Sequence, residues 1–311
     1  MKPKIVVYGT GSFNETLVTS LLMLNEAMTV AVMDSADATT AQQLEAARVA
    51  GASSMNVDLT TGTATDLVTA DAIVIGDVVA LAPEASRDET LAASLPVIRE
   101  LMREAMAQGF TGKIVVAGQY DGLLTYFAQR FSGISAANCI GIGTLAHSHI
   151  LTTTLAKAFN VNLTALHAYV IGIASQHVVA WSRSTVGPVP VLSLMANEDI
   201  NFDAAQLGDI EQRLNEAVIS SNDVVRAQAV IRVIQGLFLE RPLVGTLTNL
   251  LTTMDGQTLP LSTPVRLNAA GVSKLVDVTY SDVEQRELDD ISDVVREATH
   301  NIETGGLGQE A

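Results

Sequence analysis

The first half of the chain alternates short runs of apolar, mostly β-branched residues with longer stretches of helical periodicity. The apolar runs span 4–8, 29–33, 72–75, 113–117 and 139–142, and the helical stretches span 15–27, 40–50, 91–108 and 123–131. Consecutive apolar positions are typical of strands buried on both faces, as in a parallel sheet with helices on each side. The pattern predicts an α/β fold with a doubly wound parallel sheet. We expect strand 4–8 in its middle, flanked by strands 29–33 and 113–117.

The pattern changes after residue 159. Strand-like runs then span 163–173, 243–252, 265–267 and 272–278, and helical stretches span 203–237 and 282–300. Such a mixture predicts an α+β second domain after the α/β one. We therefore expect a first domain over 1–143, a second over 144–303 and a glycine-rich flexible tail over 304–311.

Composition narrows the class of protein. The 311 residues are 48% hydrophobic, which suffices for one large or two moderate cores. The net charge of −16 opposes any nucleic-acid partner, because phosphate backbones are bound by clustered Lys and Arg. The chain has neither a signal-peptide pattern nor a long uncharged apolar run, so we expect a cytoplasmic protein without membrane association. Its single cysteine, Cys139, lies in an apolar run and is expected to fill the core.

The most informative turn joins the first strand to the first helix, where residues 9–14 read GTGSFN. Gly9 and Gly11 allow a tight turn and close approach of the backbone to a pyrophosphate, which the N-terminus of the following helix favours. This predicts a Rossmann-type dinucleotide-binding domain in which Gly9, Gly11, Ser12 and Phe13 contact the cofactor. The third glycine of the usual pattern is Asn14. Alternatively, the glycines only shape a turn.

Asp34 ends the second strand, where a carboxylate would bind ribose hydroxyls and repel a 2′-phosphate. This position favours NAD over NADP as the cofactor. The alternative is that Asp34 caps the next helix.

Several segments resemble the lactate/malate dehydrogenase family, with the 2-hydroxyisocaproate branch nearest in character. They read KIVVAGQYDGLLTY at 113–126, FSG at 131–133, CIGIGTLAHSHI at 139–150 and VVAWS at 178–182, and 261–272 carries that family's S-x-P-x-x-x-G turn. The resemblance covers nearly the whole chain. It implies an NAD-type cofactor, a small 2-oxo acid as a candidate ligand, and a homodimer or homotetramer. Gln119 then stands where that family has the Asn that positions the nicotinamide.

The chain departs from this family where the chemistry would occur. The family's Asp that orients its catalytic histidine falls on His147, and its carboxylate-binding Arg falls on Ile150. The catalytic histidine itself falls on Ile173 or Ala174, depending on the direction of counting. Since neither side chain can donate a proton to a carbonyl oxygen, the resemblance implies dehydrogenase activity that is lost or strongly reduced.

Two other positions concern the same site. Asp77 places an extra carboxylate near the expected path of the cofactor. Arg87 aligns with the family's mobile-loop arginine, which polarises the substrate carbonyl; alternatively, it is an exposed arginine at a helix start. The specificity position would fall near Ala80, whose small side chain suits a hydrophobic 2-oxo acid.

The histidines offer a second hypothesis. His147, His149 and His177 could converge at the cleft, where His147 or His177 would serve as a relocated proton donor. The chain would then be an active NAD-dependent oxidoreductase on a hydrophobic 2-hydroxy or 2-oxo acid. His147 and His149 point to different faces of a helix and no cysteine or carboxylate completes a ligand set, so no metal site is expected. The default reading is that these histidines are polar residues of a degenerate cleft.

Overall fold

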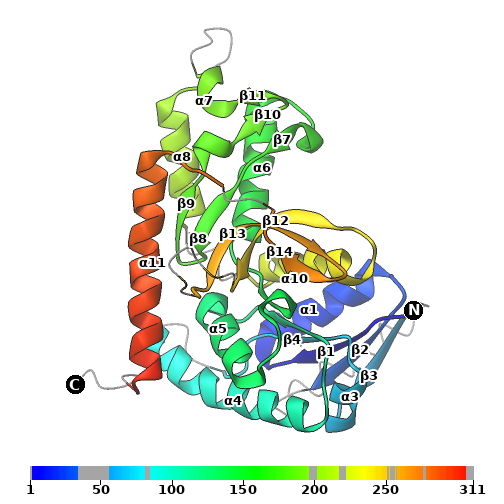
Figure 1. Cartoon of the computed structure of the whole chain (residues 1–311). Helices are drawn as coiled ribbons and strands as arrows, with labels where there is room; N and C mark the ends of the chain where they lie inside the picture. The colour runs from blue at the N-terminus through cyan, green and yellow to red at the C-terminus, as the bar shows by residue number, and fades with distance from the viewer. Residues whose placement is uncertain are drawn as a thin grey trace.

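The computed structural model of the chain describes residues 2–33, 56–80, 85–195, 202–216, 222–250, 252, 256, 258–275 and 278–305. Figure 1 shows an α/β part at the N-terminal end of the chain and a second part built around the long helix α6. One 11-stranded sheet runs through both parts. This architecture confirms the predicted α/β class with a mixed second part.

The first part is a parallel sheet of six strands in the order β3-β2-β1-β4-β5-β6. These are β1 (Lys4–Tyr8), β2 (Met28–Met33), β3 (Val57–Thr61), β4 (Ala72–Ile75), β5 (Lys113–Val116) and β6 (Cys139–Gly141). The interior positions of β1, β4 and β5 are all buried, which confirms that both faces of the sheet are covered.

The neighbours of the central strand differ from the sequence-based expectation. Strand β1 pairs with β2 on one side and with β4 on the other, whereas β5 pairs with β4 and β6. The expectation that strand 113–117 flanks strand 4–8 was therefore wrong. After β3 the chain crosses back to the free edge of β1, and each later right-handed crossover adds the next strand outward. The order reverses between β1 and β4, which is where open α/β sheets form a ligand crevice.

Helices cover both faces of this sheet. On one face lie α1 (Gly11–Leu24) and α10 (Asp223–Phe238), whose buried residues share a core with Ile5, Val7 and Val30. On the other face lie α4 (Arg87–Ala107) and α5 (Asp121–Ser132), with the short α3 (Ala64–Thr69) nearby. Leu17 and Leu21 of α1 are fully buried against the sheet, and Leu24 is partly buried.

The second part continues the same sheet in antiparallel fashion. Strand β12 (Leu243–Asn249) bridges β6 through Thr248 and Gly141, and β13 (Leu261–Asn268), β8 (Val170–Ile173) and β9 (Gln176–Val179) follow. Strand β14 (Gly271–Ser273) pairs with β13, and β7 (Leu166–His167), β10 (Thr185–Val186) and β11 (Val189–Pro190) form a small separate sheet. Helices α6 (Leu145–Phe159), α7 (Val191–Leu194) and α8 (Ala204–Leu214) pack around them.

Several predicted elements of this part were wrong in extent, and two of them are each divided in the structure. Run 163–173 contains a 3₁₀ turn at Leu163–Ala165 and two separate strands, β7 and β8. Stretch 203–237 contains two helices, α8 and α10, rather than one.

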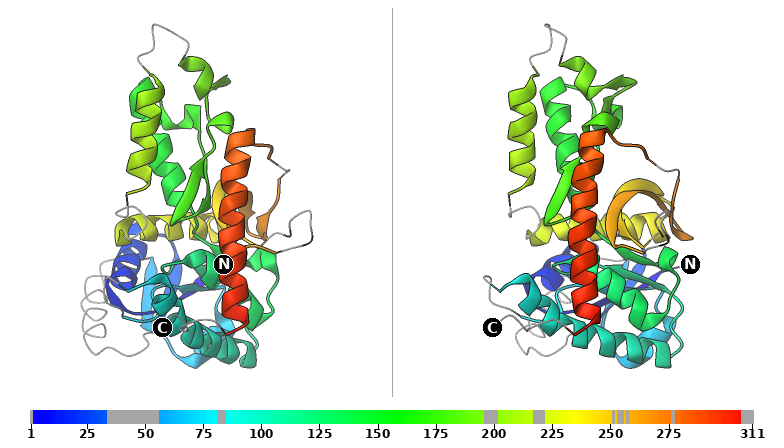
Figure 2. Two further views of the ribbon diagram at one scale, coloured as in Figure 1. Left: turned by 90° about the vertical axis from the view of Figure 1, so that its left-hand side faces the viewer. Right: turned by 60° about the vertical axis from the view of Figure 1, so that its left-hand side comes forward.

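The last helix, α11 (Asp282–Glu303), runs alongside both parts of the molecule, as both views of Figure 2 show. Its buried stripe joins the core cluster that also contains residues of α4, α5 and β8; the stripe consists of Leu288, Ile291, Val295 and Ala298. Among the helices that the structure describes, none has the length and apolar character required to cross a membrane.

Candidate active site

Two adjoining cavities lie at the carboxyl ends of the parallel strands. The glycine-turn compartment has a volume of about 250 Å³ and is lined by Thr10, Gly11, Ser12, Gly76, Asp77, Val78, Val79, Ala80, Thr90, Ser94 and Leu124. The central cavity has a volume of about 420 Å³, and its lining includes Arg87, Tyr120, His147, Ile173, Ala174 and Arg226. Gly118 and Gln119 line both. Ala80 therefore lies in the compartment and not among the residues lining the central cavity.

The turn between β1 and α1 has the geometry of a phosphate site. Gly9 and Gly11 have φ values of 147° and 78°, which glycine adopts far more readily than other residues. A side chain at Gly11 would enter open space, since no atom lies within 4 Å of its ideal Cβ position. Helix α1 begins here without a side-chain cap and without an acidic residue in its first turn, so its N-terminus retains its positive dipole end. These residues fit the pyrophosphate of a dinucleotide.

Asn14 lies beneath this turn rather than in the compartment. The residue is 1% exposed, and neither Nδ2 nor Oδ1 of its side chain has a hydrogen-bond partner. Its amide contacts the backbone of two glycines so closely that an ideal Cβ at Gly9 would lie 2.6 Å from Nδ2 and one at Gly76 would lie 2.1 Å from Oδ1. Glycine at position 76 thus leaves room for the side chain of Asn14, which stands where the usual pattern has its third glycine.

We expect the substitution Gly76→Ala to lower the free energy of unfolding by about 1–3 kcal/mol, because the new methyl group would overlap Asn14 and crowd Phe13. Urea denaturation of the variant measures this loss. Adding Asn14→Ala removes the overlapping amide and should recover most of the stability. A double variant no more stable than Gly76→Ala alone would show that Asn14 is not the obstacle.

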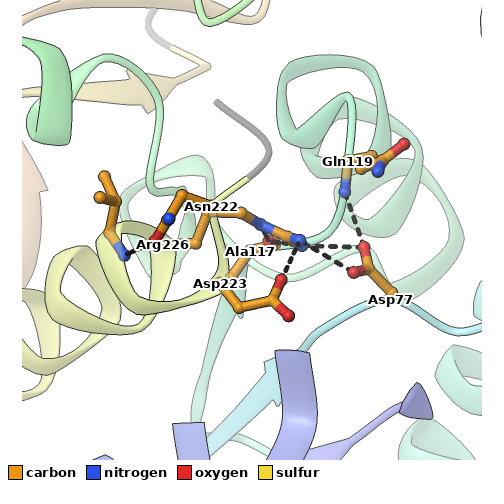
Figure 3. Close-up of polar contacts among 7 residues, drawn as sticks. Asp77, Ala117, Gln119, Asn222, Asp223 and Arg226 are labelled. Atoms are coloured by element: carbon orange, nitrogen blue, oxygen red, sulfur yellow. Dashed lines mark hydrogen bonds and ion pairs between the residues drawn. The ribbon is translucent and has the colours of Figure 1, made fainter. Parts of the chain in front are cut away.

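Asp77 follows β4 and forms a bidentate ion pair with Arg226 of α10, shown in Figure 3. Nη2 of Arg226 donates to Oδ1 of Asp77 at 2.8 Å, and Nη1 donates to Oδ2 at 2.9 Å. The backbone N–H of Gln119 donates to the same carboxylate at 3.0 Å, and the Asp77 carbonyl accepts from the N–H of Thr10 at 2.6 Å. The extra carboxylate that sequence analysis placed near the cofactor path therefore has a cationic partner.

Arg226 itself is held on every side. The residue is 4% exposed, and its guanidinium stacks 3.9 Å from the centre of the Phe13 ring. Nε and Nη2 also donate to the carbonyl of Ala117, and Nη1 lies 3.5 Å from Oδ1 of Asp223. The side chain of Phe13, which was expected to contact the cofactor, is 1% exposed, supports Arg226 and lines neither cavity; the contact stays a prediction.

Sequence reasoning missed Arg226, although the sequence carried a signal for it. Arg226, Val230, Val233 and Leu237 follow one another at helical spacing along the buried stripe of α10. An arginine on an otherwise apolar stripe is a buried charge that needs a partner from another element. The partner, Asp77, is 149 residues away, so its identity required the structure.

His147 and His177 come together, as the histidine hypothesis supposed. Their ring centroids are 4.8 Å apart, and Nδ1 of His147 and both ring nitrogens of His177 lack a hydrogen-bond partner. Burial, with a smaller contribution from the neighbouring His177, lowers the pKa of His147 to about 3. Burial also lowers the pKa of His177, against a smaller opposing effect of the Ala174 backbone. Only His147 of this pair lines the central cavity; His177 lines a separate groove near Trp181 and Glu284.

The other histidines lie elsewhere. His149 contacts Arg232 of α10, with Nη2 of Arg232 3.0 Å from Nδ1 of His149. His167 on β7 and His300 on α11 are exposed. Within the described part of the chain, no group of three His, Cys, Asp or Glu side chains is placed to hold a metal ion.

The remaining predicted positions are placed as follows. Ile173 and Ala174 line the central cavity, whereas Ile150 packs against the core of the second part. Arg87 begins α4, lines the central cavity, and pairs with Asp88 at 2.9 Å with 44% of its side chain exposed. Asp34 lies outside the described residues.

The residue after Gln119 has an unusual backbone. Tyr120 has φ 59° and ψ 37°, a left-handed conformation that costs a non-glycine residue about 1–3 kcal/mol. It lines the central cavity and directly precedes α5. The strain therefore falls in the lining of the central cavity, next to Gln119, which lines both cavities.

Asp121 forms the floor of the central cavity. The residue is 4% exposed, and its Oδ2 accepts from the backbone N–H of Gly143 at 2.9 Å and from Oγ1 of Thr248 at 2.8 Å. Burial raises the pKa of this carboxyl, while the bonds from Gly143 and Thr248 oppose that rise. Asp121 thus ties α5 to β12 and to the turn before α6.

Comparison with known proteins gives a consistent result. Residues 3–141 match the model of the lactate/malate dehydrogenase NAD binding domain, and residues 148–305 match that of the lactate/malate dehydrogenase alpha/beta C-terminal domain. An L-lactate dehydrogenase of Lactococcus lactis subsp. cremoris is 23% identical over 312 residues, covering 96% of this chain and 98% of that protein. L-lactate dehydrogenase 3 of Bacillus cereus is 30% identical over 148 residues, 47% of each chain.

Solved structures show the same fold. The minor L-lactate dehydrogenase from Enterococcus mundtii, in its ligands-bound form, superimposes with a TM-score of 0.87 at 20% identity, covering 97% of this chain and 98% of that one. A lactate dehydrogenase from a Medee basin deep-sea metagenome library gives the same TM-score and identity, with 97% and 99% covered.

Proposed function

Because the chain belongs to the lactate/malate dehydrogenase family, we propose that it is a dehydrogenase-like protein that binds NAD weakly and has lost most or all of the ordinary 2-hydroxy acid dehydrogenase activity. Its first matched segment is the family's NAD-binding domain, so NAD is the cofactor that the fold supports. We place the boundary between the dinucleotide-binding domain and the second domain after residue 143. By analogy with the family, we propose a homodimer or homotetramer.

The observation that carries this proposal is that apolar side chains line the central cavity at the positions to which the family's catalytic histidine aligns. Ile173 and Ala174, to which the family's catalytic histidine aligns, line the cavity and exchange no protons. His147 also lines it, but its pKa of about 3 leaves it neutral at pH 7. A neutral imidazole is a poor acid, and proton donation contributes roughly 10²–10⁴ in rate to such a reduction.

Binding of a 2-oxo acid carboxylate is also impaired. Ile150 replaces the family's clamp, and its side chain packs in the core of the second part. Of the arginines lining the central cavity, Arg226 is committed to Asp77 and Arg87 is paired with Asp88. A bidentate arginine is what makes such carboxylate recognition strong. Arg226 cannot offer one without leaving its partner, whereas the exposed pair with Asp88 holds Arg87 only weakly.

The cofactor preference is tested directly by calorimetry. We expect NADH to bind in the millimolar to high micromolar range and NADPH to bind more weakly, because Asp34 would repel the 2′-phosphate. The variant Asp34→Ala should narrow the difference between NADH and NADPH. A folded protein that shows no heat with millimolar NADH would contradict the cofactor assignment.

The alternative function is an active NAD-dependent oxidoreductase on a hydrophobic 2-hydroxy or 2-oxo acid, with His147 or His177 as the relocated proton donor. This alternative is supported by the position of His147 in the central cavity, which Arg87 also lines. Comparison of His147→Ala with His177→Ala identifies which histidine is the proton donor, since only the variant that removes the donor should abolish NADH oxidation.

A further inference from the structure

The two cavities meet where the Asp77–Arg226 pair crosses between β4 and α10. Asp77 lines the glycine-turn compartment, Arg226 lines the central cavity, and the wall between them is Gly118 and Gln119. In a doubly wound fold the dinucleotide lies across this crevice, with its pyrophosphate on the first helix and its two nucleosides on either side. A ligand that extends from Gly11 toward His147 must therefore pass the ion pair.

The Asp77–Arg226 pair is held in place by several further hydrogen bonds. A guanidinium has five N–H donors, and those of Arg226 are directed to Asp77, to the Ala117 carbonyl and to Asp223. Asp77 is fixed in turn by the N–H of Gln119. Separating such a buried pair leaves an uncompensated charge, which is far costlier than opening an exposed one.

Resting on the proposed function, we infer that Asp77 and Arg226 determine which part of NAD the cleft accepts. The glycine-turn compartment takes the pyrophosphate, and the pair excludes the nicotinamide riboside from the central cavity. The two residues are thus specificity determinants, and the ligand class that fits the closed cleft is a nucleoside diphosphate rather than a whole dinucleotide.

The consequence is measurable by comparing ADP-ribose, which lacks nicotinamide, with NADH on the complete protein. If the nicotinamide end makes no contacts, wild-type protein should bind the two within about threefold of each other by calorimetry. The fluorescence of bound NADH should stay close to that of free NADH, because its nicotinamide remains in water.

The double variant Asp77→Asn, Arg226→Met removes the bridge, leaves the net charge unchanged and keeps an apolar side chain against Phe13. We expect NADH to bind at least about tenfold more tightly to it, with ADP-ribose changed by less than about threefold. The matched control is Arg232→Met, which removes a half-buried arginine of the same helix away from both cavities and should leave the ratio unchanged.

Three results would overturn the inference: wild-type protein that already binds NADH tenfold more tightly than ADP-ribose, a double variant that gains equally for both ligands, or no binding of either ligand to either protein. The comparison of NADH with ADP-ribose on wild-type protein needs no variant, so it still decides the question if the double variant fails to fold. Wild-type turnover would bear on the proposed function and on the closed passage alike, so it does not isolate the role of the pair. Wild-type reduction of a 2-oxo acid would contradict the proposed function, whereas the ligand ratio decides the role of the pair.

Discussion

Wild-type protein should reduce pyruvate, oxaloacetate and branched 2-oxo acids with kcat/KM at least about 10³-fold below the roughly 10⁴–10⁸ M⁻¹s⁻¹ of working enzymes. The loss has two sources: the missing proton donor at Ile173 and Ala174, and the missing carboxylate clamp at Ile150. Steady-state oxidation of NADH, followed with each acid at millimolar concentration, measures it. A turnover number of about 1–10³ s⁻¹ on any of them would refute the degenerate-site proposal.

The same proposal can be tested by restoring the family's side chains and measuring whether activity appears. The variant His147→Asp, Ile150→Arg, Ala174→His restores the side chains of the family at the three aligned positions, and it should be made with and without the Asp77→Asn, Arg226→Met background. We expect measurable turnover only in the combined variant, because both the chemistry and the passage for nicotinamide are then present. Turnover in the three-residue variant alone would count against a closed passage.

Stability should fall steeply with acid because of His147. In the folded state its pKa is about 3, whereas the ordinary pKa of a histidine, which applies in the unfolded chain, is 6.5. Between these values the unfolded chain binds one proton more than the folded chain, so the free energy of unfolding rises with pH and is lost as pH falls through this window. The contribution is about 1.4 kcal/mol for each pH unit. The stability that depends on neutral His147 is fully present above pH 6.5.

The measurement is urea denaturation of wild type and His147→Leu at pH 7, 6 and 5. Carboxylates titrate in both proteins, so the difference in unfolding free energy between the two proteins isolates the effect of the histidine. Below pH 6, the unfolding free energy of the variant should rise relative to that of wild type by about 1.4 kcal/mol per pH unit. His300→Leu removes an exposed histidine of α11 and should run parallel to wild type. If the plot of unfolding free energy against pH for His147→Leu also runs parallel to that of wild type, the pKa of His147 is not lowered in the folded state.

Among the parallel strands, the sequence predicted those whose interior is buried and missed the one that is mostly exposed. Strand β3 reads VDLTT and buries only Val57 fully, because it is the edge strand of the sheet. Its alternation is too weak to separate from a loop. The strands 4–8, 72–75 and 113–117 were found because both of their faces are covered. Their order was misjudged since hydrophobic periodicity carries no information on which strands are neighbours.

The site divides in the same way. The glycine turn could be read locally, because backbone conformation there depends on residues adjacent in sequence. The contact of His147 with His177 was anticipated through the resemblance to the family, which brings these segments together. The Asp77–Arg226 pair was not anticipated, since it joins residues that neither periodicity nor a motif relates.

The floor residue Asp121 has a consequence for how the molecule comes apart. It binds Gly143 and Thr248, and Thr248 is also the bridge partner of Gly141 at the junction of the parallel and antiparallel strands. Helix α11 adds its apolar stripe to a cluster shared with α4, α5 and β8. Neither half can therefore melt without exposing core surface of the other. Heating should produce a single cooperative heat-absorption peak for the described body of the chain, despite its two-domain sequence pattern.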